Sequence, residues 1–357
     1  MKATSLQSAT ARWLHRQWQK RGLWAGLLWP VSCLALCYVS AKRRWYQPGG
    51  KRVYRAPVPV VIVGNIYVGG VGKTPVLIAL VQQLVTLGWN PGVISRGYGV
   101  KLGSTPRVGR DELDARSFGD EPALISQQTH APVGVHPNRR LACQALLQAY
   151  PEVDIIVSDD GLQHLALARD VEILVQDARQ AGNGWLLPAG PLREPPSRLR
   201  TVDLVITRQA IQPQHFEQPP ARKQPAEVSM WLQITGIHSL DNKINLSVNE
   251  FIKKQKNKSS CAIAAISEPD RFFQSLGNAA IRYQSSIGLP DHHPLDAAFF
   301  KTQQADLLLI TTKDAVKCRS LHDPRIWVVD TQAVFSDPLW AASISAQLTH
   351  RATAQPE

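Results

Sequence analysis

The chain has 357 residues, of which 44% are hydrophobic and 19% charged, and this balance excludes a largely disordered protein. Its length favours two domains over one. The net charge of +12 predicts a surface that attracts anions, but the chain carries no recognisable nucleic-acid-binding module, so we expect no nucleic-acid partner. The five cysteines lack the spacing of metal ligands and are expected to be reduced thiols in a cytosolic compartment.

An uncharged apolar run, LWAGLLWPVSCLALCYV, occupies residues 23–39. At about 17 residues it is at the short end of what spans a bilayer, and Pro30 interrupts it. Basic and aromatic residues flank it on both sides, as they do at membrane interfaces. We therefore predict that residues 1–45 form a hydrophobic helical segment that associates with anionic membrane lipids. The alternatives are a helix that packs on the protein's own core and a cleaved signal peptide.

The next part of the chain, residues 46–210, alternates apolar runs with helical patterns. Short runs typical of buried strands predict strands at residues 58–63, 92–95, 153–157, 171–175 and 203–207. Apolar residues at helical spacing predict helices at residues 75–87, 121–128 and 139–150. Strands that alternate with helices in this way indicate a parallel sheet with helices on both faces.

A stretch rich in proline and glutamine, residues 211–230, predicts a linker. Beyond it, residues 231–357 are expected to form a smaller carboxyl-terminal α/β domain. Its predicted elements are strands at 262–266, 279–283, 307–311 and 326–329 and a helix at 270–276.

A glycine-rich loop, Gly-Gly-Val-Gly-Lys-Thr at residues 69–74, lies between the first strand and the first helix of the 46–210 domain. Glycines let the backbone wrap phosphate oxygens, Lys73 brings a cation to the β- and γ-phosphates, and the Thr74 hydroxyl can ligate magnesium. Tyr67 stands where the usual pattern has a further glycine. The order of strand, loop and helix predicts a P-loop NTPase core with ATP and Mg²⁺ as cofactors. The expected nucleotide-binding residues are Val68, Gly69, Gly70, Val71, Gly72, Lys73, Thr74 and Pro75.

Two adjacent aspartates, Asp159 and Asp160, follow the apolar strand at 153–157. The carboxyl end of a parallel strand is where ligands bind. A carboxylate there can hold magnesium, directly or through water, together with Thr74. Because adjacent side chains point in different directions, we expect one of the two to reach the metal, and the sequence leaves open which one.

Phosphoryl transfer to an alcohol needs a base for the acceptor hydroxyl and cations for the charge that develops on the phosphoryl oxygens. Asp120 and Glu121 open a predicted helix, and His292 lies in a loop of the carboxyl-terminal domain. Each has an ordinary alternative, because acids at a helix start are commonly caps and loop histidines are commonly solvated. Arginines beside glycine, proline or a strand end face an anionic ligand or form surface salt bridges. They are Arg96, Arg139 and Arg193.

Six motifs are distributed over nearly the full chain. They are GN at 64–65 with GGVGKTP at 69–75, SRGYG at 95–99, GDEP at 119–122, DDGLQH at 159–164, GNG at 182–184 with LPAGPLRE at 187–194, and TKDAVK at 312–317. Together they resemble one family, the tetraacyldisaccharide 4'-kinases. Two positions depart from the family pattern, since Ser267 replaces a usual glycine and Thr312 a frequent glutamate.

The resemblance implies an activity and a location. Members phosphorylate the 4'-hydroxyl of the tetraacyl disaccharide 1-phosphate precursor of lipid A with ATP and give lipid IVA, on the cytoplasmic face of the Gram-negative inner membrane. It also implies that Asp120 is the catalytic base with His292 as its partner, and that Lys73, Thr74 and the aspartate pair hold ATP and magnesium. The substrate contacts it implies are Glu121, Gln163, Arg96, Arg139 and Arg193.

The alternative function is a membrane-associated nucleotide switch of the partition ATPase type. Such proteins carry a lysine directly before the first glycine of the loop, where this chain has Val68. A GTPase is disfavoured as well, because Ala315 stands where the guanine-binding motif requires an aspartate. Both observations favour the kinase.

Overall fold

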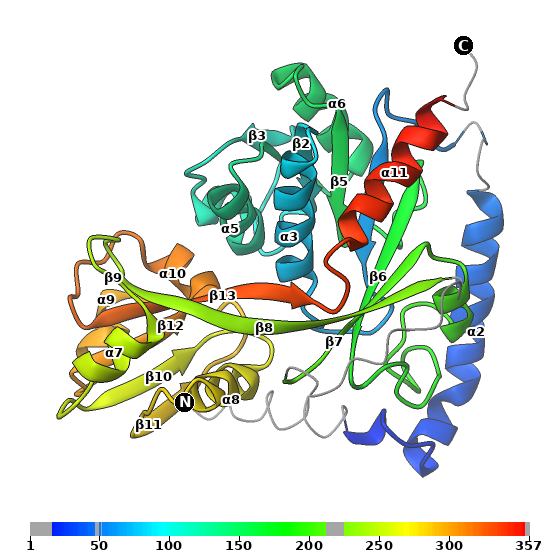
Figure 1. Ribbon diagram of the computed structural model, residues 1–357. Helices are drawn as coiled ribbons and strands as arrows, with labels where there is room; N and C mark the ends of the chain where they lie inside the picture. The colour runs from blue at the N-terminus through cyan, green and yellow to red at the C-terminus, as the bar shows by residue number, and fades with distance from the viewer. Residues whose placement is uncertain (1–15, 47–49, 51, 212–224, 354–357) are drawn as a thin grey trace.

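A computed structural model of the chain describes residues 16–46, 50, 52–211 and 225–353. Its centre is one continuous, mainly parallel sheet with helices on its faces (Figure 1). The strand order is β11-β10-β12-β13-β8-β7-β6-β1-β5-β2-β4-β3, and β9 pairs with β8. The predicted α/β architecture is therefore confirmed.

The amino-terminal half of the sheet carries the P-loop strand at its centre. Its parallel strands are β1 (Val60–Gly64), β2 (Pro91–Ser95), β4 (Val133–Val135), β5 (Ile155–Asp159), β6 (Val171–Asp177) and β7 (Leu204–Arg208), and β3 (Arg107–Gly109) is an antiparallel edge. Helices cover both faces, so strands such as β1 and β5 are buried at every residue. The strands predicted from apolar runs all form, with ends displaced by one or two residues.

The helices of this half are α3 (Lys73–Thr86), α4 (Ala115–Phe118), α5 (Asp120–Thr129), α6 (Arg139–Ala149) and the 3₁₀ turn η1 (Pro196–Arg200). Three of them, α3, α5 and α6, follow the predicted positions, and two short ones, α4 and η1, were not predicted. The Asn138 side chain caps α6 by accepting a hydrogen bond from the backbone N–H of Arg140. Helix α3 begins inside the P-loop, two residues before the predicted start, as a phosphate-binding helix must.

Two long antiparallel strands, β8 (Ala226–Ser239) and β13 (Ile326–Phe335), join the halves of the sheet. The first residues of β8 pair in parallel with β7. Residues 226–230 were predicted as linker and instead form strand, because Val228 and Met230 are buried in the core. Residues 212–224 of the predicted linker lie outside the described residues.

The carboxyl-terminal half is a smaller α/β unit. Its other strands are β9 (Asn245–Leu246), β10 (Ser260–Ala264), β11 (Ser285–Gly288) and β12 (Leu307–Thr311), and its helices are α7 (Val248–Lys254), α8 (Pro269–Asn278), α9 (Ala297–Lys301) and α10 (Thr312–Cys318). The strand predicted at 279–283 is wrong. Ala280 has a φ of 58° in the turn that ends α8, and buried Ile281 packs in that turn rather than in the sheet.

The last helix, α11 (Trp340–Thr353), returns to the P-loop half and packs beside α3 (Figure 1). Trp340, Ile344 and Leu348 are buried in the same apolar cluster as α3 and β1. The end of the segment predicted as a carboxyl-terminal domain therefore stabilises the P-loop half. The proposed division at residues 45, 210 and 230 otherwise stays a prediction.

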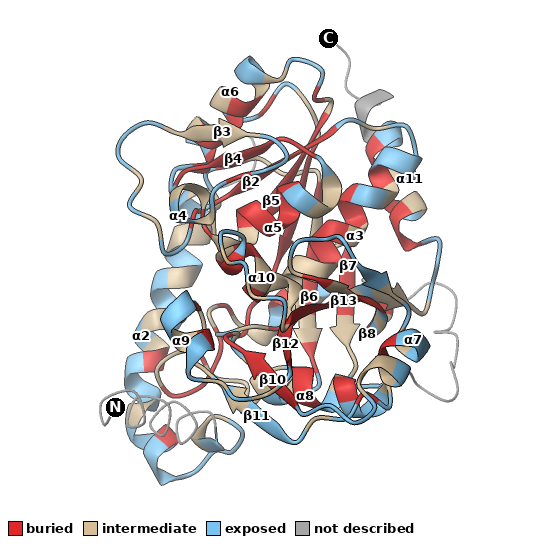
Figure 2. Ribbon diagram, turned by 90° about the vertical axis from the view of Figure 1, so that its left-hand side faces the viewer, coloured by how far each residue is buried: buried red, intermediate tan, exposed pale blue. Residues whose placement is uncertain are grey.

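Helix α2 (Leu23–Trp45) runs along one side of the molecule and is exposed over most of its surface (Figures 1 and 2). It is the one described helix that is long and apolar enough to cross a membrane by length and composition. Only Ala25 and Ser32 are buried. The Ser32 hydroxyl donates to the carbonyl of Leu186 at 2.7 Å and accepts from the N–H of Ala189 at 2.9 Å. One narrow face of α2 is thus docked on the protein.

Candidate active site

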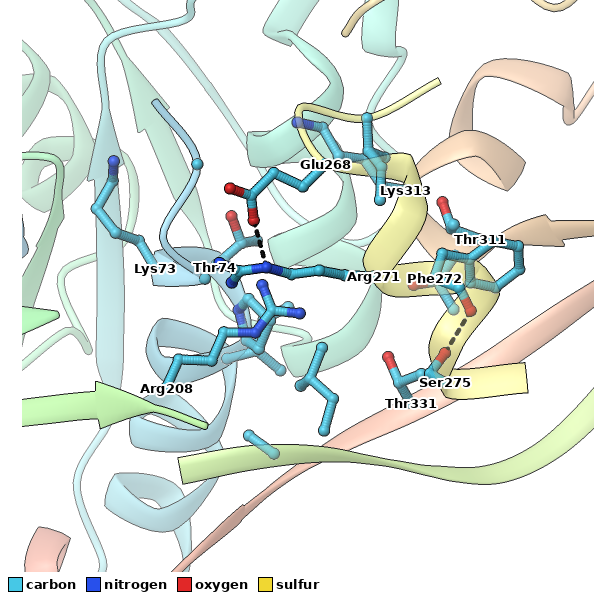
Figure 3. A pocket seen from close by; sticks show the side chains of 18 of the residues that line it. Lys73, Thr74, Arg208, Glu268, Arg271, Phe272, Ser275, Thr311, Lys313 and Thr331 are labelled. Atoms are coloured by element: carbon cyan, nitrogen blue, oxygen red, sulfur yellow. Dashed lines mark hydrogen bonds and ion pairs between the residues drawn. The ribbon is translucent and has the colours of Figure 1, made fainter. Parts of the chain in front are cut away.

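A cavity of about 440 Å³ opens between the P-loop and helix α8 (Figure 3). One wall is the loop from Gly70 to Pro75, and the opposite wall comes from Glu268, Arg271 and Phe272 at the start of α8. The cavity therefore lies between the two halves of the sheet, at the carboxyl ends of the P-loop strand and its neighbours, where open α/β sheets bind ligands.

The P-loop is shaped by glycines in conformations that side chains rarely adopt. Gly69 has a φ of +102° and Gly72 a φ of +92°. Between the strand and the loop, the Asn65 amide donates to the carbonyl of Tyr67, and its oxygen accepts from Lys73 Nζ at 3.2 Å. Tyr67 is buried, so the residue at the unusual position packs the base of the loop instead of wrapping phosphate.

The two aspartates at the end of β5 occupy different environments. Asp159 is buried and accepts a hydrogen bond from the Ser95 hydroxyl at 2.9 Å, whereas Asp160 forms ion pairs with Lys73 at 3.4 Å and Arg193 at 3.0 Å. Burial, followed by the charge of nearby Glu121, raises the pKa of Asp159 to about 6. Burial also opposes ionisation of Asp160, but the lysine and the arginine outweigh it and lower its pKa.

Oxygen donors of the kind that magnesium prefers surround the P-loop. They are the Thr74 hydroxyl and the carboxylates of Asp159 and Asp160. No group of three or more His, Cys, Asp or Glu side chains placed to hold a metal occurs in the described part of the chain. The donor set thus fits a magnesium ion that takes one or two protein ligands and completes its shell with phosphate oxygens and water.

The predicted base and its partner lie together. Asp120 Oδ2 is 2.9 Å from His292 Nδ1 and 3.7 Å from Lys317 Nζ. Burial alone makes ionisation of Asp120 less favourable, yet the hydrogen bond to His292 and the positive charge of Lys317 lower its pKa overall. Asp120 therefore stays an ionised carboxylate, the form that accepts a proton from an alcohol.

A second cluster sits next to this pair. Lys313 Nζ lies 2.9 Å from Glu121 Oε1 and 3.3 Å from Asp291 Oδ1, and these carboxylates raise its pKa against the opposing effect of burial. The Ser267 hydroxyl donates to Asp291 at 2.5 Å. Lys313 thereby joins α5 of the P-loop half to α10 of the carboxyl-terminal half.

Arg193 connects the P-loop to the amino-terminal helix. Besides pairing with Asp160, Arg193 lies 3.5 Å from the Gln163 amide oxygen, and Gln163 donates to Glu194 at 2.7 Å. Lys42, in the last turns of α2, donates to the Gln163 carbonyl at 3.2 Å. Two predicted substrate residues, Gln163 and Arg193, thus share one hydrogen-bonded group with the membrane-type helix.

The other two predicted substrate arginines differ in exposure. Arg139 is only 3% exposed and donates to the carbonyls of His136 and Asp159, at 3.1 and 2.9 Å, so it fixes the end of β5. Arg96 is exposed in the loop after β2. Its charge, after burial and Arg139, contributes to a lowered pKa of about 4 at His164. Arg96 is therefore free to meet an anion, while Arg139 is placed to support the site.

An ion-pair network that the sequence did not predict ties the P-loop to α8. Arg179 donates to the Gly70 carbonyl at 2.8 Å and pairs with Asp177 at 2.6 Å and Glu268 at 2.9 Å. Arg271 pairs with the same two carboxylates, at 2.8 Å for Asp177 and 2.6 Å for Glu268, and Figure 3 shows the pair with Glu268. The residues come from the end of β6 and the start of α8, so only the fold brings them together.

Lysines of α10 were also missed as members of the site. Lys313 and Lys317 belong to a motif that carried the family resemblance, but their spacing of four residues gave no role by itself. In the structure this spacing places them on one helix face toward Glu121 and Asp120. The sequence signal that could have identified them was the position of two basic residues, one helical turn apart, directly after a predicted strand.

Comparison with known proteins places the chain among sequence relatives. The family model described as tetraacyldisaccharide-1-P 4'-kinase matches residues 24–349. A Bordetella petrii tetraacyldisaccharide 4'-kinase is 49% identical over 348 residues, covering 97% of this chain and 98% of the relative. A Vibrio cholerae enzyme of the same name is 44% identical, covering 91% of this chain and 92% of the relative.

The fold also has a solved counterpart. The crystal structure of Aquifex aeolicus LpxK in complex with ATP matches with a TM-score of 0.74, covering 92% of this chain and 98% of that chain at 23% sequence identity. The family match spans most of the chain, and the relatives match it over nearly their whole length. This chain belongs to the tetraacyldisaccharide 4'-kinase family.

Proposed function

We infer that this chain is an ATP-dependent kinase that phosphorylates the 4'-hydroxyl of the tetraacyl disaccharide 1-phosphate precursor of lipid A and gives lipid IVA. The observation that carries this inference is the Asp120–His292 pair, 2.9 Å apart, held next to a P-loop in a chain of this family. A nucleotide switch needs no such base, so the alternative of a partition-type switch has no support in the site.

The P-loop supports ATP binding, and the fold's counterpart was solved in complex with ATP. We propose that Lys73, which contacts Asn65 and Asp160 here, turns to the β- and γ-phosphates of bound ATP. Thr74 with Asp159 or Asp160 would hold magnesium, which neutralises charge on the phosphoryl oxygens when bound. Of the two aspartates, Asp160 is the better candidate, because its lowered pKa keeps it ionised.

On the acceptor side, we propose that Asp120 accepts the proton of the sugar 4'-hydroxyl while the oxygen attacks the γ-phosphorus in line. His292 fixes the carboxylate through its Nδ1 atom, and Lys317 keeps it ionised. Arg96, Arg193, Gln163 and Glu121 would contact the disaccharide and its phosphate. Arg193 and Gln163 are supported in this role by their position between Asp160 and helix α2.

Membrane association follows from the exposed surface of α2. Large apolar side chains cover it, among them Leu23, Leu27 and Leu34, each more than 70% exposed. The last turn carries Lys42, Arg43 and Arg44. Lys42 and Arg43 contact Gln163 and Glu194, and the exposed Arg44 suits an anionic headgroup on the cytoplasmic side. We propose that α2 inserts into the inner membrane and brings the site to a substrate whose acyl chains remain in the lipid.

The test is transfer of the labelled γ-phosphate of ATP to the acylated disaccharide, compared with release of free phosphate. We expect the label in the lipid product, with hydrolysis a minor reaction. The Asp120→Asn variant serves as control, because it keeps the size of the side chain and loses the base. ATP hydrolysis without lipid labelling, equal in both proteins, would contradict the kinase assignment.

A further inference from the structure

Arg208 is the last residue of β7 and lines the cavity between the P-loop and α8 (Figure 3). Its side chain lies across the loop at Gly72. A Cβ atom added to Gly72 would come 2.8 Å from Arg208 Cδ and 3.3 Å from its Nη1. The guanidinium therefore sits beside backbone that wraps phosphates in P-loop proteins.

The Arg208 guanidinium has no carboxylate within ion-pair distance among the described residues. Within residues 16–46, 50, 52–211 and 225–353 its side chain makes no hydrogen bond or ion pair, whereas Arg179 and Arg271 share Asp177 and Glu268. Burial, and after it the charge of Arg271, lowers the pKa of Arg208 to about 10, with Glu268, Asp177 and Arg179 as its other charged neighbours. Arg208 is thus still charged at neutral pH, and an anion next to it would satisfy its donors.

The sheet order indicates which part of the nucleotide meets Arg208. Strands run in the order β7-β6-β1-β5, so Arg208 and the aspartates at the end of β5 lie on opposite sides of the P-loop strand. The γ-phosphate must face Asp160 and the acceptor base. The remainder of the nucleotide then extends toward β7, where Leu232 and Phe272 line the same cavity and offer apolar surface to a base.

We propose that Arg208 binds the α- and β-phosphates of the nucleotide and holds the ADP portion before and after transfer. The proposal rests on the proposed kinase function, because it assigns a residue to the same nucleotide. A planar guanidinium matches two phosphate oxygens at once. Since ADP keeps these oxygens through the reaction, Arg208 binds the ground state and the transition state alike, which changes KM rather than kcat.

The experiment measures nucleotide binding and turnover separately in the full-length protein with Arg208→Gln and Arg208→Lys. Titration calorimetry with ADP should give a dissociation constant raised about tenfold to a hundredfold for Arg208→Gln, the loss typical of a charged hydrogen bond. The KM for ATP should rise in parallel while kcat at saturating ATP stays near the wild-type value. The ADP affinity of Arg208→Lys should fall between those of the wild type and Arg208→Gln, because lysine keeps the positive charge and loses the two-pronged geometry of the guanidinium. Arg282→Gln, at an exposed arginine outside the cavity, is the matched control.

Three results would overturn the proposal. Unchanged ADP affinity and unchanged kcat in Arg208→Gln would show that Arg208 does not contact the nucleotide. Unchanged ADP affinity with a lower kcat would place Arg208 at the γ-phosphate instead. A loss of adenosine affinity equal to that of ADP would place it at the base. Failure of the kinase assignment gives a different pattern, in which wild-type protein binds ADP with the expected dependence on Arg208 but labels no lipid.

Discussion

His292 Nδ1 lies 2.9 Å from Asp120 Oδ2, although the two residues are 172 positions apart in the chain. Asp120 begins α5 in the P-loop half, and His292 comes from the loop after β11 in the carboxyl-terminal half. On the proposed function, the base and the group that orients it thus belong to different halves of the sheet. Catalysis therefore depends on how the halves are held together.

Replacing His292 should change both the rate and its pH dependence. In His292→Ala, burial still opposes ionisation of Asp120 while the hydrogen bond that lowers its pKa is lost, so the pKa rises although Lys317 and Lys313 remain. Because the base must be ionised, the acid limb of the kcat profile should move to higher pH, and kcat at pH 7 should fall by about a hundredfold or more. The measurement is lipid phosphorylation from pH 4 to pH 9, because the wild-type acid limb lies below the ordinary carboxylate pKa of 3.8 and the limb of the variant should enter this range. A lower rate with an unmoved acid limb would show that His292 acts elsewhere.

Asp159 should make the protein less stable at neutral pH. Its folded-state pKa of about 6 exceeds the ordinary 3.8, so the folded state binds a proton that the unfolded state lacks between these values. Stability from this group is therefore lost as the pH rises through about 4 to 6 and stays lost above that. Asp159→Asn should raise the free energy of unfolding at pH 8, by at most about 3 kcal/mol for a shift of two pKa units.

Urea unfolding in the presence of a chelator measures this effect without a contribution from metal binding. The advantage of Asp159→Asn should be constant above pH 7 and narrow steadily toward pH 4. Asp337→Asn, at an exposed aspartate, is the control and should show no such trend. An advantage that does not depend on pH would mean that packing, not ionisation, accounts for it.

Lys313 should stabilise the contact between the two halves. Lys313→Met leaves Glu121 and Asp291 without their shared cation, and we expect a loss of about 1–3 kcal/mol in the free energy of unfolding. Glu121→Gln should lose less, because Asp291 remains as a partner of Lys313. The double variant measures the coupling, which should be about 1 kcal/mol if the two side chains interact directly. Strict additivity of the two single losses would contradict the pairing.

Exposed leucines on α2 should determine membrane binding without affecting the fold. Leu27 and Leu34 are each 71% exposed, so asparagine at both positions removes apolar surface and breaks no buried contact. We expect less protein to sediment with anionic vesicles and a lower rate with acylated substrate, at unchanged thermal stability. The matched control replaces Val85 and Leu339, which are exposed apolar residues outside α2, and should sediment like the wild type.

Five strands of the P-loop half, β1, β2, β5, β6 and β7, were predictable because they are largely buried and read as apolar runs, whereas the three-residue strands β3 and β4 were not predicted. Strand β8 (Ala226–Ser239) was not predicted at all, and its first residues, 226–230, follow a proline-rich segment that resembles a linker. Ile281 led to the opposite error, a strand predicted where there is none. An apolar residue can be buried in a turn as fully as in a strand. A local pattern of apolar residues indicates that they are buried, but it does not indicate whether they lie in a strand, a helix or a turn.

The residues of the candidate site also divide into those that the sequence predicts and those that it does not. Lys73 and Thr74 can be recognised from the sequence, because the residues of a P-loop are contiguous. Arg208 and Arg271 carry no local signature, since a lone arginine at a strand end or in a helix is compatible with many roles. They meet only because β7 and α8 flank the same cavity. Residues whose roles depend on the order of strands in the sheet are those that sequence reasoning misses.

Helix α2 can present one face to the lipid and the other to the site. Ser32 docks the helix sideways on Leu186 and Ala189, so the outer face with Leu27 and Leu34 is left to meet the bilayer. Lys42, near the end of the same helix, contacts the Gln163 carbonyl. On the proposed function, the groups that receive the sugar therefore lie beside the bilayer surface, and the enzyme does not have to extract a lipid with four acyl chains into water.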